Sequence, residues 1–191
     1  MKRIAIFLSG TGTNAERLIK HFAQSDTVEV AAVISNTAKA PAIERLKPLG
    51  VEVEVWGRDT WRDQRAIAKY LTDLKVDAIV LAGFLAIIGE PLLKAFPDRI
   101  VNIHPALLPK HGGKGMWGHH VHEAVLRDGD KESGITIHLV NDQVDGGAIL
   151  EQHRCPVMPG DTPDTLAARV HQLEYQYFPS AVDHFLNTIQ S

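Results

Sequence analysis

Short apolar runs alternate along the N-terminal half of the chain with longer segments in which apolar residues recur three and four positions apart. The short runs predict strands, and the longer segments predict amphipathic helices. The predicted strands are residues 3–8, 28–34, 51–56, 77–82 and 99–104, and the predicted helices between them are residues 14–24, 40–50, 61–74 and 90–96. This alternation favours a mostly parallel, Rossmann-like sheet flanked by helices.

The pattern changes after residue 105. A glycine-rich loop is followed by a predicted helix near residues 119–127, by strands at 134–140 and 147–157, and by a long helix at about 162–188. Thr162 and Pro163 are a cap residue and a first-turn proline, which is a usual start of a helix. We therefore predict an α/β fold in which the parallel sheet carries an antiparallel C-terminal extension.

Composition narrows the class of protein. A length of 191 residues fits one domain or two small ones. The net charge of −3 and the lack of a basic block argue against a nucleic-acid or membrane partner. Cys155 is the single cysteine, so no intrachain disulfide can form, and we expect a reducing, cytoplasmic location. The apolar run near the N-terminus is too short for a signal peptide, and no run reaches the roughly 18–20 residues that span a bilayer.

The loop after the first predicted strand, "SGTGTNA" (9–15), is a candidate phosphate site. Gly10 and Gly12 allow the backbone to approach a ligand closely, and the following helix N-terminus suits an anion. We favour a monophosphate here. Binding of NAD is a weaker alternative, because the second strand ends in Ser35 and Asn36 rather than in an acid. A plain turn, capped by the side chain of Thr13 or Asn14, is the structural alternative.

The segment "VNIHPALLPK" (101–110) places two polar side chains at the end of a predicted strand. Asn102 and His104 are two apart and so point to the same face. Together they can stabilise an oxyanion and handle a proton. Asp145 precedes two glycines, and a carboxylate near His104 would stabilise its protonated ring. Taken singly, His104 is as easily a packed strand-end residue, and Asp145 an ordinary turn residue.

Ten histidines raise the question of a metal. His119, His120 and His122 form a cluster with His111 nearby, but their spacing matches no HExxH motif. One cysteine also excludes a cysteine-rich zinc site. We expect no metal and a solvated or loop-anchoring role for the cluster.

The motifs "SGTGTN", "NIHPALLPK" and "DGGAIL", in this order, resemble those of the phosphoribosylglycinamide formyltransferases, a folate-dependent family of purine biosynthesis. The resemblance covers essentially the whole chain and implies the formyltransferase fold as one domain, 1–191. Residues 1–100 would form a phosphate-binding half and residues 101–191 a catalytic and folate-binding half. The implied reaction moves the formyl group of 10-formyltetrahydrofolate to the amine of glycinamide ribonucleotide. Because the folate carries the one-carbon unit, the reaction needs no metal. The implied partners are these two small molecules, with a monomer or homodimer as the assembly.

The resemblance also implies roles for single residues. The oxyanion would be stabilised by His104 and Asn102, with Asp145 supporting His104. The substrate would be bound by Gly12, Thr13, Asn14 and Glu174. The folate would be bound by Arg62, Leu85, Ala86, Ile87, Ile88, Asn102, Val140, Asn141 and Asp142. The family further suggests a cis bond between Leu108 and Pro109.

One segment departs from the family pattern. Many members have a shorter Gly-Leu-His-Thr-His type of sequence where this chain has "HGGKGMWGHHVHEA" (111–124). The runner-up function is therefore a related folate-dependent formyltransferase acting on another amine, such as an amino sugar nucleotide. Outside this class, a non-catalytic nucleotide-binding domain and a dinucleotide oxidoreductase remain as alternatives.

Overall fold

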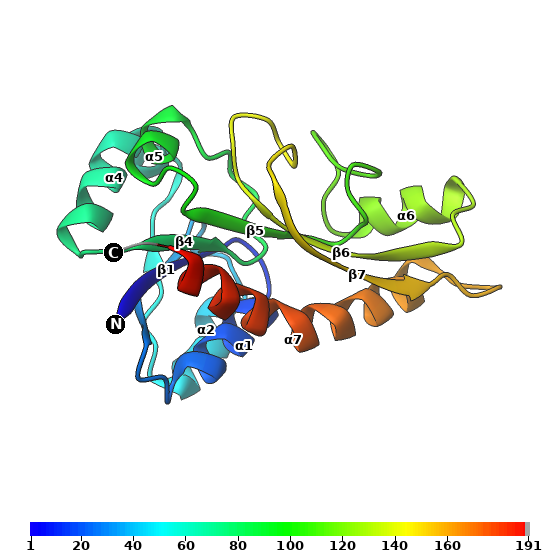
Figure 1. The fold of residues 1–191 in the computed structure, drawn as a ribbon, viewed down its shortest axis with the longest axis horizontal. Coiled ribbons are helices and arrows are strands. Elements are labelled where there is room, and N and C mark those ends of the chain that lie inside the picture. Colours follow the sequence, from blue (N-terminus) through cyan, green and yellow to red (C-terminus); the bar gives the residue numbers. More distant parts are fainter. Residues whose placement is uncertain (190–191) are drawn as a thin grey trace.

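The computed structural model describes residues 1–189 as a seven-stranded sheet with helices on both faces (Figure 1). The sheet order is β3-β2-β1-β4-β5-β6-β7. The strands are β1 (Lys2–Leu8), β2 (Val28–Ser35), β3 (Glu54–Val55), β4 (Ala78–Leu81), β5 (Ile100–His104), β6 (Glu132–Leu139) and β7 (Ile149–Pro156). All pairs from β3 to β5 are parallel, whereas β6 pairs antiparallel with β5 and β7 pairs antiparallel with β6. The predicted fold class is confirmed.

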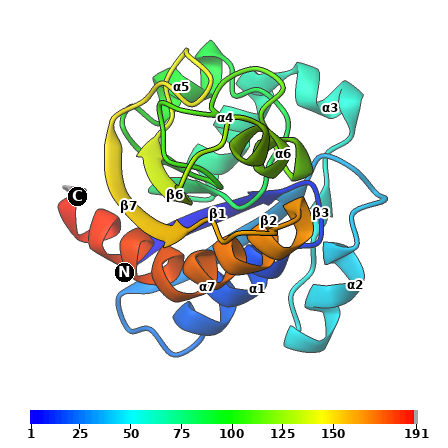
Figure 2. The same ribbon diagram turned by 90° about the vertical axis from the view of Figure 1, so that its right-hand side faces the viewer.

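The helices divide between the two faces of the sheet (Figures 1 and 2). They are α1 (Thr13–Phe22), α2 (Ala42–Leu46), α3 (Arg58–Arg62), α4 (Gln64–Asp73), α5 (Glu90–Ala95), α6 (His119–Arg127) and α7 (Pro163–Thr188), with a short 3-10 helix η1 (Lys47–Leu49). Helices α1, α2 and α7 lie on one face, and α4 and α5 lie on the other. The alternation within β1 explains this, because Ile4 and Ile6 pack in the first core while Ala5 and Phe7 pack in the second.

Three predicted elements differ from the structure. The strand predicted at 51–56 is only β3, because this edge segment pairs with just the last two residues of β2. The helix predicted at 61–74 is split into α3 and α4 at Asp63, whose side chain caps α4 by accepting a hydrogen bond from the amide of Ala66. The helix predicted at 40–50 ends at Leu46 and continues as η1, which contains Pro48.

The predicted start of the last helix is confirmed. Thr162 is the N-cap of α7. Its hydroxyl accepts a hydrogen bond from the amide of Thr165, and the hydroxyl of Thr165 accepts one from the amide of Thr162. Pro163 occupies the first turn. Helix α7 then runs along the face of the sheet, beside α1, and brings its buried residue Glu174 to the ends of the central strands.

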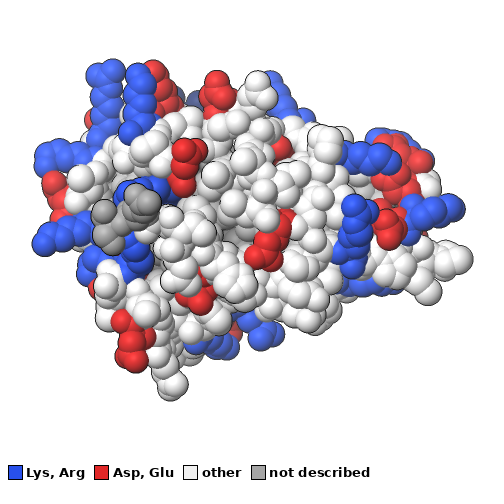
Figure 3. Space-filling model, viewed as in Figure 1, with Lys and Arg blue, Asp and Glu red and all other residues white. Residues whose placement is uncertain are grey.

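The surface and the hydropathy of the helices give further constraints. On the face shown in Figure 3, Lys and Arg are interspersed with Asp and Glu, mostly toward the ends of the molecule. Within residues 1–189, no helix is long and apolar enough to cross a membrane.

The strand order reverses between β1 and β4, and in such sheets ligands bind beyond the carboxyl ends of the strands at this point.

Candidate active site

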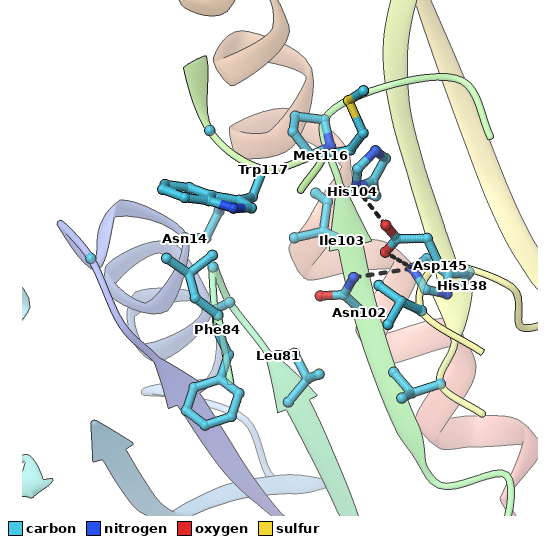
Figure 4. Close-up of a pocket in the computed structure, with 18 of the residues that line it drawn as sticks. Asn14, Leu81, Phe84, Asn102, Ile103, His104, Met116, Trp117, His138 and Asp145 are labelled. Atoms are coloured by element: carbon cyan, nitrogen blue, oxygen red, sulfur yellow. Dashed lines mark hydrogen bonds and ion pairs between the residues drawn. The ribbon is translucent and has the colours of Figure 1, made fainter. Parts of the chain in front are cut away.

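A cavity of about 680 Å³ lies beyond the ends of β1, β4 and β5. Five segments line it: residues 10–14 after β1, 81–88 at the end of β4, 102–105 at the end of β5, 113–119 at the start of α6, and 138 with 140–145 at the end of β6. Helix α7 adds residues that include His171 and Glu174. Figure 4 shows Asn102, His104, His138 and Asp145 together on one side of this cavity, with Asn14 and Trp117 on the other.

The loop after β1 leaves helix α1 without a side-chain cap. Gly12, not Thr13 or Asn14, is the N-cap residue, at φ 74°, so the proposed side-chain cap is wrong. A Cβ atom at Gly12 would lie 2.5 Å from the Cβ atom of Ala42, which leaves room only for glycine. Arg45 holds the loop from outside by donating from Nε to the carbonyl oxygen of Thr11 at 2.8 Å. The first amides of α1 are therefore free of side-chain caps and border the cavity, as an anion site requires.

Asn102 is oriented by a residue that the sequence patterns did not single out, His138. The two residues face each other in the antiparallel register of β5 and β6. Nδ1 of His138 lies 2.8 Å from the carbonyl oxygen of Leu139, and its Nε2 forms a hydrogen bond of 3.0 Å with Nδ2 of Asn102. A polar residue inside the apolar run 134–140 was the available signal, but its partner depends on the strand register.

His104 lies between Asp145 and the loop that follows β5. Its Nε2 donates to the carbonyl oxygen of His111 at 2.8 Å, and its Nδ1 lies 3.6 Å from Oδ2 of Asp145. Burial lowers the pKa of His104 below its usual value, and the charge of Asp145 counteracts part of this effect. The sequence-predicted pair is thus brought together, in a buried setting.

Asp145 contacts three groups at once. Its Oδ2 accepts a hydrogen bond from the amide of Gly113 at 2.9 Å, and its Oδ1 lies 3.6 Å from Nε2 of His138. Burial acts to raise the pKa of Asp145, but the interactions with His138, His104 and the Gly113 amide outweigh it, so the pKa lies below its usual value. The carboxylate is therefore ionised and fixed at neutral pH, as a group that supports an imidazolium must be.

A second polar group lines the cavity on the α7 side. Nδ2 of Asn14 donates to Oε2 of Glu174 at 2.9 Å, and Nδ1 of His171 lies 2.9 Å from the same oxygen. The hydrogen bond with Glu174 raises the pKa of His171. Oδ1 of Asn14 and Nδ1 of His122 are buried without a hydrogen-bond partner. Burial and the nearby His171 lower the pKa of His122 to about 4, so its ring is neutral at pH 7.

The residues expected to bind folate fall into two groups. Residues 85–88 and 140–142 line the cavity, and Leu85 and Ile87 expose large apolar side chains beside it. Exposed apolar side chains at a cavity are typical of ligand contact. Arg62 lies elsewhere: it is on α3, pairs with Asp59 at 3.3 Å, and does not line the cavity.

The histidine cluster forms no metal site within residues 1–189, where no group of three or more His, Cys, Asp or Glu side chains could hold an ion. His111 instead anchors its loop through Asp130, whose Oδ2 lies 2.8 Å from Nε2 of the ring. His119 and His122 share helix α6, but His119 pairs with Asp164 whereas His122 is buried. The bond between Leu108 and Pro109 is cis, as the family resemblance suggested.

Comparison with known proteins gives one consistent family. The sequence profile described as formyl transferase matches residues 2–182. Phosphoribosylglycinamide formyltransferase of Haemophilus influenzae is 37% identical over 190 residues, which are 97% of this chain and 87% of that protein. The trifunctional purine biosynthetic protein adenosine-3 of Drosophila melanogaster is 36% identical over 97% of this chain, which spans only 14% of that protein. The crystal structure of phosphoribosylglycinamide formyltransferase from Brucella melitensis has a TM-score of 0.85 at 35% identity, over 100% of this chain and 98% of that one. These similarities include every segment that lines the cavity.

Proposed function

The chain belongs to the formyl transferase family, and from this membership we propose which residues of its cavity carry out each part of the reaction. The reaction is transfer of the formyl group of 10-formyltetrahydrofolate to the amine of glycinamide ribonucleotide, a step of purine biosynthesis. The observation that carries the assignment is the convergence of Asn102, His104 and Asp145 at a cavity that also contains the capless start of α1.

The acceptor substrate binds on the α1 and α7 side. The amides of Gly12, Thr13 and Asn14 face its phosphate, and the helix dipole favours the negative charge. Glu174 receives the polar end of the molecule that lies beyond the phosphate. Support comes from the contact of Asn14 with Glu174, which joins the two ends of this subsite in one hydrogen-bonded unit.

The folate binds on the opposite wall. Leu85, Ala86, Ile87 and Ile88 supply apolar surface and backbone groups, and Val140, Asn141 and Asp142 supply the second side of the slot. The exposed side chains of Leu85 and Ile87 and the size of the cavity fit a flat bicyclic ring. Arg62 is not part of this wall, because on α3 it pairs with Asp59 and does not line the cavity.

The catalytic group acts on the charge that develops in the reaction. When bound, 10-formyltetrahydrofolate supplies a formyl carbon that the acceptor amine attacks, and N10 leaves with a proton while the amine loses one. Asn102 donates an amide N–H to the oxygen on which negative charge appears, and His138 holds that amide in place. The positive charge of protonated His104 stabilises the same oxygen, while its two ring N–H groups face the carbonyl oxygen of His111 and the carboxylate of Asp145. The new negative charge and Asp145 both favour the imidazolium, against the effect of burial.

One assay tests this function. Purified protein is incubated with 10-formyltetrahydrofolate and a panel of amine acceptors that includes glycinamide ribonucleotide and an amino sugar nucleotide, and each product is identified by mass. We expect a mass increase of one formyl group on glycinamide ribonucleotide without added metal. Transfer only to another amine would overturn the substrate and keep the reaction class.

We propose that residues 1–100 form the phosphate-binding half and residues 101–191, of which 190 and 191 lie outside the described part, the catalytic and folate-binding half. A monomer or homodimer in the cytoplasm remains the expectation from the sequence.

A further inference from the structure

The glycine-rich loop (residues 111–118), which departs from the family pattern, crosses the cavity. Its first part is held by the catalytic pair, since the carbonyl oxygen of His111 accepts from His104 and the amide of Gly113 donates to Asp145. Its last part leads into α6, where Nδ1 of His119 lies 3.5 Å from Oδ1 of Asp164 on α7. The loop therefore spans from the catalytic pair to the helix that carries Glu174.

Trp117 is the largest side chain on this loop. It lines the cavity and is 50% exposed, and its ring contacts that of His120 at a centroid distance of 5.3 Å. Figure 4 shows the indole on the same side of the cavity as Asn14, away from Asp145. A tryptophan left half-exposed at the edge of a cavity has apolar surface and an N–H group that a ligand can cover.

We propose that Trp117 is a binding residue for the ribose phosphate part of the acceptor substrate. The inference rests on the proposed function, because that function places the phosphate at Asn14 and the polar end of the acceptor at Glu174. The indole ring covers the apolar face of the sugar, and Nε1–H donates to an oxygen of the sugar or phosphate. By covering the acceptor, the ring also excludes water, which would otherwise compete with the amine for the formyl group.

The position of Trp117 favours the acceptor over the folate. The apolar wall of the folate slot comes from residues 85–88 and 140–142, on other loops. Trp117 instead lies two residues before His119, which contacts the same helix as Glu174. If the indole stacked on the folate instead, it would have to add to a wall of the slot that these other loops already form.

Steady-state kinetics of Trp117→Ala and Trp117→Phe test the proposal. We expect the KM for glycinamide ribonucleotide to rise about tenfold or more in Trp117→Ala and less in Trp117→Phe, which keeps an aromatic ring. The KM for 10-formyltetrahydrofolate should stay within about twofold. Met158→Ala is a matched control, because Met158 is 49% exposed and lies outside the cavity. Thermal unfolding of all variants excludes a merely structural effect.

Fluorescence gives a second readout. Of the three tryptophans, all within the described residues, only Trp117 lines the cavity, since Trp56 and Trp61 pack against the second core. Titration with glycinamide ribonucleotide alone should change the emission of the wild-type protein, and Trp117→Phe should abolish this change. An unchanged KM for the acceptor in Trp117→Ala, an equal rise in the KM for folate, or a response that persists in Trp117→Phe would each overturn the inference. Failure of the wild-type protein to formylate glycinamide ribonucleotide would overturn the proposed function instead.

Discussion

Replacement of Asp145 by asparagine is the most direct perturbation of the proposed mechanism. Asp145 has φ 56°, a left-handed conformation that asparagine tolerates well. The amide oxygen of asparagine can also keep the hydrogen bond from the amide of Gly113. Asp145→Asn therefore removes the negative charge beside His104 while it preserves the turn, which Asp145→Ala would not.

The magnitude follows from the distance between the two charges. Oδ2 of Asp145 lies 3.6 Å from Nδ1 of His104. At about this separation and an effective dielectric constant of about 20, the charges of a carboxylate and an imidazolium interact by about 4 kcal/mol. Since about 1.4 kcal/mol corresponds to a factor of ten in rate, the upper limit is roughly a 1,000-fold loss. Removal of one preorganised donor typically costs about 100- to 1,000-fold, so we expect kcat to fall within this range.

The pH dependence of kcat/KM should shift in a direction that follows from the charge of Asp145. The charge of Asp145 raises the pKa of His104, so its removal lowers that pKa further. In the proposed mechanism the imidazolium is the active form, so activity should be lost as the pH rises through the pKa of His104. In Asp145→Asn the alkaline limb of kcat/KM should therefore move to lower pH, while equilibrium binding of both substrates stays within a few-fold.

Two comparisons make the test decisive. Asp73→Asn removes a carboxylate from an exposed ion pair with Lys69 outside the cavity, and it should leave kcat unchanged. Because His104 and Asp145 act as one unit, the double variant with His104→Asn should be little slower than the slower single variant. If Asp145→Asn kept kcat within a few-fold of wild type and left the alkaline limb in place, Asp145 would only shape its turn, and the mechanism would be wrong.

Backbone geometry, burial and capping give three further expectations. In Gly12→Ala, at φ 74°, the new Cβ atom would lie 2.5 Å from a side chain of α2, so we expect the free energy of unfolding in urea to fall by about 2–4 kcal/mol and the KM for the acceptor to rise. In the control Gly50→Ala, at φ 70° with no atom within 4 Å, the free energy of unfolding should fall by only about 1 kcal/mol. Equal losses in the two variants would contradict the clash. The pKa of His122 is lowered to about 4 from 6.5 for a free ring, so the unfolded chain binds more protons than the folded chain between these pH values. The stability that comes from neutral His122 is therefore complete above pH 6.5 and is lost as the pH falls toward 4. His122→Gln should flatten the dependence of the unfolding free energy on pH in this range. Thr162→Ala should cost about 1 kcal/mol in the same urea assay, because it removes the cap of α7.

Features encoded over a few neighbouring residues were predictable from the sequence. The loop at 9–15 follows a strand and opens a helix, and the spacing of Asn102 and His104 places them on one face of β5. The start of α7 is likewise local, since Thr162 and Pro163 define it together. Short-range errors also had local causes: the break at Asp63 is a capping choice that hydrophobic periodicity does not detect, and it leaves Arg62 on a separate exposed helix.

Contacts between distant segments could not be predicted in the same way. The pairing of Asn102 with His138 depends on the register of two antiparallel strands. The contact of Asn14 with Glu174 joins residues 160 positions apart, on helices that meet only in the folded chain. The hydrogen bond from His104 to the carbonyl oxygen of His111 depends on how the loop after β5 folds back. Each of these contacts orients a side chain that the sequence did mark as functional.

The Asp-Gly-Gly segment forms a turn and also brings the carboxylate of Asp145 close to His104. Leu139 ends β6 beside the start of β5, so the chain must turn back for Asp145 to approach His104 at the other end of that strand. The turn is tight enough that a Cβ atom at Gly147 would lie 1.7 Å from the carbonyl oxygen of Leu139, so only glycine fits. Because the two glycines have no side chains, the chain can turn tightly enough to bring the carboxylate to His104. Asp145 then holds the glycine-rich loop by accepting a hydrogen bond from the amide of Gly113. The geometry of the turn and the position of the charge are two consequences of the same three residues, and the asparagine variant separates them because it changes only the charge.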